Sequence, residues 1–250
     1  MSSLNPWPYP FWMAHRGAGK LAPENTLAAF RLGAQYGYRM FECDVKLSAD
    51  GVPFLLHDAT LERTTNGHGT AGELTWAALS QLDAGSWHSR TCAGEPLPTF
   101  EHIARWCLAN GCLLDIEIKP TPGQEAETGR AVAEAAQRWW RDAAVPPLLT
   151  SFQAESLCAA QQAAPDLPRG LLLDKLWSGW DDVARQLKAV AVICQHRMWD
   201  AALVAQVKGM GMRCLSYTVN DEAEVQRLVA LGTDGVVTDA VDRFAPSGGA

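Results

Sequence analysis

Two segments of the sequence alternate charged and apolar residues, as a strand does when its two faces meet different surroundings. They are MFECDVKL at 40–47 and LLDIEIKP at 113–120. Their charged residues are Glu42, Asp44 and Lys46 in the first segment and Asp115, Glu117 and Lys119 in the second. If the two strands are neighbours in the sheet, their carboxylates lie close together.

Carboxylates that lie close together in a buried place resist ionisation unless a cation lies among them. Glu42, Asp44 and Glu117 offer only oxygen atoms, which suit Mg²⁺ or Ca²⁺ better than zinc. The alternative is an ion-pair network with nearby lysine and arginine side chains. Inward-facing charges are a poor source of stability, and two segments repeat the arrangement, so the sequence favours one divalent cation, Mg²⁺ or Ca²⁺.

Two histidines are expected at the same place. His15 ends the apolar run Phe11–Ala14, and His57 ends a run that returns from the strand at 39–47 as a hairpin. A turn centred between Ala49 and Asp50 would place His57 opposite Glu42. Two histidines beside a metal can divide general acid and general base catalysis, which makes His15 and His57 the candidate catalytic residues.

Arg16 and Lys119 add positive charge to this group of acidic residues. Arginine offers planar, bidentate hydrogen bonds to phosphate oxygens, so both residues are candidates for substrate binding. A metal, an arginine, a lysine and two histidines are typical of a site for phosphoryl transfer on a small diester. Gly17 and Gly19 would let the backbone approach a substrate, although glycines in a turn are a weak signal.

Extended apolar runs alternate with helical patterns along the whole chain, which predicts a parallel sheet. The runs are 11–15, 39–47, 52–57, 112–118, 147–152, 170–173, 189–194, 212–219 and 235–238. The turn at 48–51 is too short for a crossover helix, so the run at 52–57 is antiparallel and eight parallel strands remain. We therefore expect a (β/α)8 barrel in a single domain over 1–250, with residues 60–98 as a small insertion over the barrel mouth.

Several helix ends can be read from capping residues. The expected starts are Asn25 or Thr26, Thr99, Asp200 and Asn220. The expected stops are Gly37, Gly111, Gly209 or Gly211, and Gly232.

Composition limits the partners and the compartment. The 250 residues carry a formal charge of -7, which argues against nucleic acid and against stable association with an anionic membrane. The seven cysteines are scattered, without a Cys-x-x-Cys pair, which fits a reducing cytoplasm. Met1–Pro10 lacks a basic start and a long apolar run, so export is not expected. The sequence indicates no oligomeric state.

Five motifs follow one another along essentially the whole chain: HRGAGKLAPENTLAAF, ECDVKLSADGVPFLLHDATLERTTNG, IEIKP, YTVND and DGVVTDAVD. Together they resemble the motifs of the glycerophosphodiester phosphodiesterase family. The resemblance is greatest to the cytoplasmic bacterial members linked to glycerol 3-phosphate uptake. It implies metal ligands at Glu42, Asp44 and Glu117 and catalytic histidines at His15 and His57.

The resemblance also implies phosphate contacts from Arg16 and Lys119. The implied reaction is the hydrolysis of diesters such as glycerophosphocholine or glycerophosphoethanolamine to an alcohol and sn-glycerol 3-phosphate. Two residues depart from the family pattern: Tyr217 stands where tryptophan is common, and Asp115 stands where asparagine is common. Both could change the pocket or the charge around the metal.

Two other functions use the same barrel. A phospholipase acting on intact lipid would need a basic or apolar membrane-binding surface, and the sequence has no basic amphipathic helix. A non-catalytic phosphate-binding module would lack a ligand or a histidine, whereas here every expected group is present.

Overall fold

The computed structural model describes residues 7–244 and 246; residues 1–6 of the amino-terminal segment discussed above lie outside the described part. The strands are β1 (Trp12–Ala14), β2 (Met40–Leu47), β3 (Pro53–Leu55), β4 (Leu113–Ile118), β5 (Leu148–Ser151), β6 (Arg169–Leu173), β7 (Ala191–Gln195), β8 (Arg213–Tyr217) and β9 (Gly235–Thr238). The α-helices are α1 (Leu27–Gln35), α2 (Trp76–Leu79), α3 (Phe100–Ala109), α4 (Glu125–Trp139), α5 (Ala154–Ala163), α6 (Trp180–Gln186), α7 (Ala201–Gly209) and α8 (Glu222–Leu231). The 3₁₀ turns are η1 (Ala71–Glu73), η2 (Arg90–Cys92) and η3 (His196–Met198).

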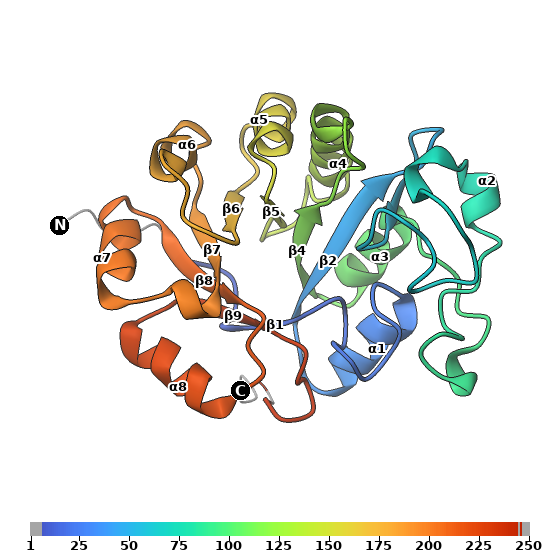
Figure 1. The fold of residues 1–250 in the computed structure, drawn as a ribbon, viewed down its shortest axis with the longest axis horizontal. Coiled ribbons are helices and arrows are strands. Elements are labelled where there is room, and N and C mark those ends of the chain that lie inside the picture. The colour runs from blue at the N-terminus through green and yellow to red at the C-terminus, as the bar shows by residue number, and fades with distance from the viewer. Residues whose placement is uncertain (1–6, 245, 247–250) are drawn as a thin grey trace.

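The parallel strands close into a barrel. Their order is β1, β9, β8, β7, β6, β5, β4 and β2, and the pairing of β1 with β2 completes the ring. The pairs around this ring are parallel, whereas β3 is attached to β2 as an antiparallel strand. Figure 1 shows the helices arranged outside the strands. The predicted (β/α)8 barrel is confirmed.

The interior of the barrel is apolar at its amino-terminal end and charged toward its carboxyl end. A small cluster that includes Met13, Met40, Leu148 and Leu215 fills the amino-terminal part of the barrel interior. On β2 the outward residues Phe41, Cys43 and Val45 belong instead to the large core under the helices. Strand alternation therefore leaves the inward positions further along β2 and β4 to the charged residues.

The predicted register of the hairpin is wrong by one residue. The structure pairs Val45 with Leu55 and Leu47 with Pro53, so the turn is centred on Asp50 and His57 lies two residues beyond the end of β3, not opposite Glu42. The reason is local. Gly51 adopts a left-handed conformation, with φ of +77°, and the amide of Ser48 donates to the carbonyl of Val52 over 3.1 Å, which closes a five-residue loop.

The helix caps agree with the sequence at most positions. Thr26, Thr99 and Asp200 each accept a hydrogen bond from the first turn of their helix, and Gly232 ends α8 in the left-handed conformation. Asn220 is not a cap, because Asp221 accepts from the amide of Glu224 at that helix start. The side-chain oxygen of Asn220 instead accepts hydrogen bonds at the end of β9.

Residues 60–98 form η1, α2 and η2. Their buried residues Leu61, Leu79 and Leu97 share a small core with Phe54 and Leu56 of the hairpin. In Figure 1 the helix α2 of this segment lies on the opposite side of the molecule from α6, α7 and α8. No helix in the described residues is long and apolar enough to cross a membrane.

Candidate active site

A cavity of about 320 Å³ lies at the carboxyl end of the barrel strands. The predicted site residues that line it are His15, Arg16, Glu42, His57, Glu117 and Lys119. His15 follows β1, His57 follows β3 and Lys119 follows β4, so different strand ends deliver these groups to one mouth. Asp44 lies behind the lining and is fully buried.

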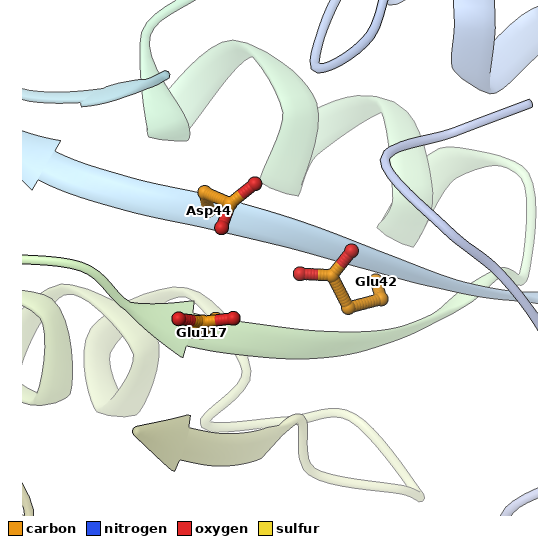
Figure 2. A group of neighbouring side chains, drawn as sticks. All are labelled: Glu42, Asp44 and Glu117. Atoms are coloured by element: carbon orange, nitrogen blue, oxygen red, sulfur yellow. The ribbon is translucent and has the colours of Figure 1, made fainter. Parts of the chain in front are cut away.

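Glu42, Asp44 and Glu117 form a compact cluster. One carboxylate oxygen from each lies within 4.8 Å of the others. The register explains this, because β2 and β4 are neighbours and Asp44 is paired with Glu117. Figure 2 shows the three carboxyl groups gathered along these two strands, as strand alternation predicts.

The cluster is electrostatically unfavourable by itself. Burial, followed by repulsion from Asp44 and Glu117, raises the pKa of Glu42 well above its ordinary value. Burial and Asp44 raise the pKa of Glu117 to about 7. Burial would also raise the pKa of Asp44, but the positive charges of Arg16 and Lys119 hold it below its usual range. Asp44 is thus stabilised as an anion, whereas Glu42 and Glu117 resist ionisation.

The residues present fit a hard divalent cation. Glu42 Oε1 and Asp44 Oδ1 are buried and accept no hydrogen bond from the residues that the structure describes. Buried carboxylate oxygens normally accept hydrogen bonds. Adjacent carboxylate oxygens that lack a donor are therefore suited to coordinate a metal ion. The donor set contains only oxygen, which suits Mg²⁺ or Ca²⁺.

Part of the alternative ion-pair network is also present. Lys119 Nζ donates to Glu117 Oε1 over 2.7 Å and lies 3.7 Å from Asp44 Oδ1, and Arg16 Nε lies 3.3 Å from Asp44 Oδ2. Among the described residues these contacts leave Glu42 Oε1 without a hydrogen-bond partner, so the network and a metal ion are compatible. Arg16 and Lys119 line the cavity, so their side chains are also placed to contact an anion there.

Asn25 holds Asp44 in place. Its side-chain amide donates to Asp44 Oδ2 over 2.8 Å, and its carbonyl oxygen accepts from the Asp44 amide over 3.1 Å. To make both contacts Asn25 adopts a φ of +59°, a conformation that asparagine tolerates better than most residues. The sequence marked Asn25 only as a possible cap.

His15 is backed by a carboxylate. Its Nδ1 lies 2.6 Å from Asp239 Oδ1, and Asp239 Oδ2 accepts from Asn220 Nδ2 over 3.0 Å. This pairing keeps the proton on Nδ1 and leaves Nε2, which lies 3.8 Å from Glu42 Oε2, for the reacting groups. Burial works against ionisation of Asp239, but the hydrogen bond from His15 gives it a net lowered pKa.

His57 has the same arrangement with its neighbour in the chain. Its Nδ1 lies 2.6 Å from Asp58 Oδ1. Burial lowers the pKa of His57, with smaller contributions from Arg16 and Lys119. At neutral pH a neutral imidazole that keeps its proton on Nδ1 offers an Nε2 lone pair as a base.

Arg16 is held from two sides. Its backbone amide donates to Glu42 Oε2 over 3.1 Å, and its guanidinium Nη1 donates to Glu24 Oε1 over 2.8 Å. The residue has a φ of +51°, so the turn after β1 directs both amide and side chain to the mouth. Glu24 therefore orients Arg16.

The two departures from the family pattern both line the cavity. The Tyr217 hydroxyl donates to the Leu173 carbonyl over 3.0 Å, and its ring meets Phe152 edge to face. Asp115 accepts from Thr150 over 2.8 Å, and burial raises its pKa to about 7. The pocket thus has an aromatic wall and a carboxyl group beside Glu42.

Sequence reasoning missed the supporting residues Asp58, Arg63 and Asp239. A signal existed for two of them, since Asp58 follows His57 directly and Asp239 follows the strand β9. Asp239, however, is separated from its partner His15 by 224 positions in the sequence. No local pattern reveals such a pair.

Fold and site together define a (β/α)8-barrel protein with an acidic, oxygen-only cluster and two carboxylate-backed histidines at the carboxyl ends of its strands. The chain belongs to the glycerophosphoryl diester phosphodiesterase family, whose model matches residues 15–243. The resemblance carried by the sequence motifs is confirmed.

Individual relatives agree with this assignment. The chain is 32% identical over 232 residues to the glycerophosphodiester phosphodiesterase of Caldanaerobacter subterraneus subsp. tengcongensis, covering 91% of this chain and 93% of that protein. A phosphodiesterase of Oleispira antarctica, solved in complex with the product sn-glycerol-3-phosphate, is 35% identical, with a TM-score of 0.89 and 94% of each chain covered. The glycerophosphodiester phosphodiesterase of Agrobacterium tumefaciens str. C58 is 29% identical, with a TM-score of 0.78 over 95% of this chain and 99% of that one.

Proposed function

We propose that the protein hydrolyses glycerophosphodiesters, such as glycerophosphocholine and glycerophosphoethanolamine, to sn-glycerol 3-phosphate and an alcohol, with one divalent cation, Mg²⁺ or Ca²⁺. The observation that carries this proposal is the meeting of the carboxylate cluster and two carboxylate-backed histidines in one cavity. Family membership and the product complex of the Oleispira antarctica relative support it.

The substrate phosphate lies at the mouth between the positive side chains. Arg16 and Lys119 bind its non-bridging oxygens, and their charge stabilises the transition state. Glu42, Asp44 and Glu117 hold the cation, which polarises the phosphoryl group when it is bound. The proton movements are left to the two histidines.

His15 and His57 move the protons at their Nε2 atoms. One imidazole takes a proton from the attacking oxygen, that of water or of a neighbouring glycerol hydroxyl, as this oxygen bonds to phosphorus. The bond from phosphorus to the leaving oxygen breaks, and the other imidazole protonates the leaving oxygen. Where the glycerol hydroxyl attacks first, water opens the resulting cyclic phosphate in a second step of the same kind. Asp239 and Asp58 hold the Nδ1 protons and stabilise each imidazolium while it carries the extra proton.

A coupled assay for sn-glycerol 3-phosphate tests the reaction on a panel of glycerophosphodiesters. The wild-type protein releases the product, and His15→Ala and His57→Ala each lower kcat by about a hundredfold or more because a proton-transfer group is lost. Wild-type rates in both variants would contradict the proposed roles. No release from any diester, with each cation supplied, would contradict the proposed function.

The same proposal includes the setting of the enzyme. We place it in the cytoplasm, with a small diester rather than nucleic acid or membrane lipid as its partner; the seven free cysteines and the charge of -7 support this. We also propose that 1–250 is one barrel domain in which residues 60–98 are an insertion.

A further inference from the structure

Arg63, in the segment 60–98, makes more side-chain contacts than an exposed arginine requires. Its Nε and Nη2 donate to Asp58 Oδ2 and Oδ1 over 2.6 Å and 2.9 Å. Its Nη1 and Nη2 donate to Glu24 Oε2 and Oε1 over 2.8 Å and 2.7 Å. Two edges of one guanidinium thus hold two carboxylates, each by a bidentate pair.

Both of these carboxylates also hold a residue of the site. Asp58 Oδ1 lies 2.6 Å from His57 Nδ1, and Glu24 Oε1 accepts from Arg16. The charges alternate along the chain of contacts from Arg16 through Glu24, Arg63 and Asp58 to His57. Each anion has a cation on either side, apart from the histidine end, where the partner is an imidazole.

We propose that Arg63 is a positioning residue that fixes both His57 and Arg16 through Asp58 and Glu24. This inference rests on the proposed function of His57 and Arg16. Arg63 brings together three chain segments that have no common element: the turn after β1, the end of the hairpin strand β3, and the segment 60–98. The segment 60–98 therefore takes part in catalysis through this side chain.

The geometry requires arginine and not merely a positive charge. A lysine ammonium is a point charge without the planar fork and cannot make two bidentate pairs at once. The side chains of Glu24 and Asp58 are only 13% and 26% exposed, so water replaces the lost donors poorly. Without Arg63, Asp58 is free to turn away from His57, and Glu24 pairs with Arg16 alone.

The first test compares Arg63→Ala and Arg63→Lys with wild type in the coupled assay. Both variants lower kcat by about tenfold or more, because a small displacement of a catalytic group is costly. Both also raise KM severalfold, because Arg16 is turned toward Glu24. Millimolar guanidinium restores part of the kcat of Arg63→Ala, and methylammonium does not.

The matched control is Arg105→Ala. Arg105 also donates through Nε and Nη2 to a carboxylate, that of Glu101, but its side chain is 71% exposed on α3 and it does not line the cavity. Its kcat and KM stay at wild-type values. Thermal unfolding of every variant verifies that the folded protein is assayed.

The second test is a double-mutant cycle with His57→Ala. If Arg63 acts through His57, the kcat of His57→Ala falls by less than about twofold when Arg63→Ala is added. An equal loss of kcat in both backgrounds overturns the positioning of His57 by Arg63. Wild-type kcat and KM in both Arg63→Ala and Arg63→Lys overturn the positioning role as a whole. Wild-type activity in His57→Ala would instead refute the proposed function of that histidine, so the two failures are distinguishable.

Discussion

At the scale of single residues, the site is a set of charges that the fold alone does not neutralise. Glu42 and Glu117 have raised pKa values because they are buried beside Asp44. Arg16 and Lys119 compensate Asp44 more than the other two carboxylates. Burying such charges costs stability in the metal-free protein, and a bound cation recovers that cost.

This account predicts the pH dependence of metal-free stability. The pKa of Glu117 is about 7 in the folded protein against an ordinary value of 4.5, so the folded state binds more protons between these values. Stability in chelator therefore falls as pH rises from about 4.5 to about 7 and stays low above it. In Glu117→Gln the fall is smaller, and at pH 8 the variant unfolds at the same or a higher temperature than wild type.

Thermal unfolding in chelator across this pH range checks the prediction. Glu101→Gln, which removes an exposed carboxylate from α3, serves as the control and keeps the wild-type pH profile. A Glu117→Gln protein that is clearly less stable than wild type in chelator at pH 8 would show that charge repulsion in the cluster does not destabilise the metal-free protein.

The sequence predicted the residues that touch the cavity better than those that support them. Alternation along each of two strands identified Glu42 and Asp44 in the first and Glu117 in the second, because a period of two is a local property. Asn25 binds Asp44 from another segment, and Asp239 binds His15 across most of the chain. Such contacts depend on closure of the barrel, which no short window of sequence contains.

At the scale of elements, the turn between β1 and α1 is packed against the end of β9. Gly19 has a φ of +57°, and a Cβ on it would lie 2.1 Å from the carbonyl oxygen of Asp239. Asp239 holds His15, so the close approach of these two turns positions a histidine. Sequence reasoning could see that Gly19 was in a turn, but not what it approached.

Gly19→Ala therefore damages activity as well as stability. We expect a loss of about 2 kcal/mol or more of unfolding free energy from strain and overlap. We also expect kcat to fall by about tenfold or more, because Asp239 must move. Chemical denaturation and the coupled assay measure the two effects.

Gly111→Ala is a matched control for this substitution. Gly111 has nearly the same φ, +62°, but nothing lies within 4 Å of an added Cβ. It loses about 1 to 2 kcal/mol for the left-handed conformation and keeps its kcat. If Gly19→Ala behaves like Gly111→Ala in both measurements, packing against Asp239 does not position His15.

Element types and order were predictable because apolar periods and caps are local signals, and Thr26, Thr99, Asp200 and Gly232 act as expected. The hairpin register was not predicted, because one left-handed glycine lengthened the turn by a residue. A shift of one residue changes which strand position is opposite His57, so register needs the turn geometry itself.

At the scale of the whole molecule, the barrel separates stability from chemistry. Apolar side chains fill the amino-terminal part of its interior, and the charged residues occupy the carboxyl end. The net charge of -7 gives no general attraction for a phosphate, so the proposed binding of a phosphate depends on the local charges of Arg16 and Lys119. A divalent cation held by Glu42, Asp44 and Glu117 would add to that local field.

The central claim is that Glu42, Asp44 and Glu117 bind the divalent cation on which hydrolysis depends. It is tested most directly by measuring sn-glycerol 3-phosphate release from glycerophosphocholine after chelation, while Mg²⁺ or Ca²⁺ is titrated back. We predict that the chelated wild-type protein is inactive, that one of the two cations restores turnover, and that Glu42→Gln and Glu117→Gln are not restored at that concentration. Full turnover in excess chelator, or in either variant without added cation, would contradict the account.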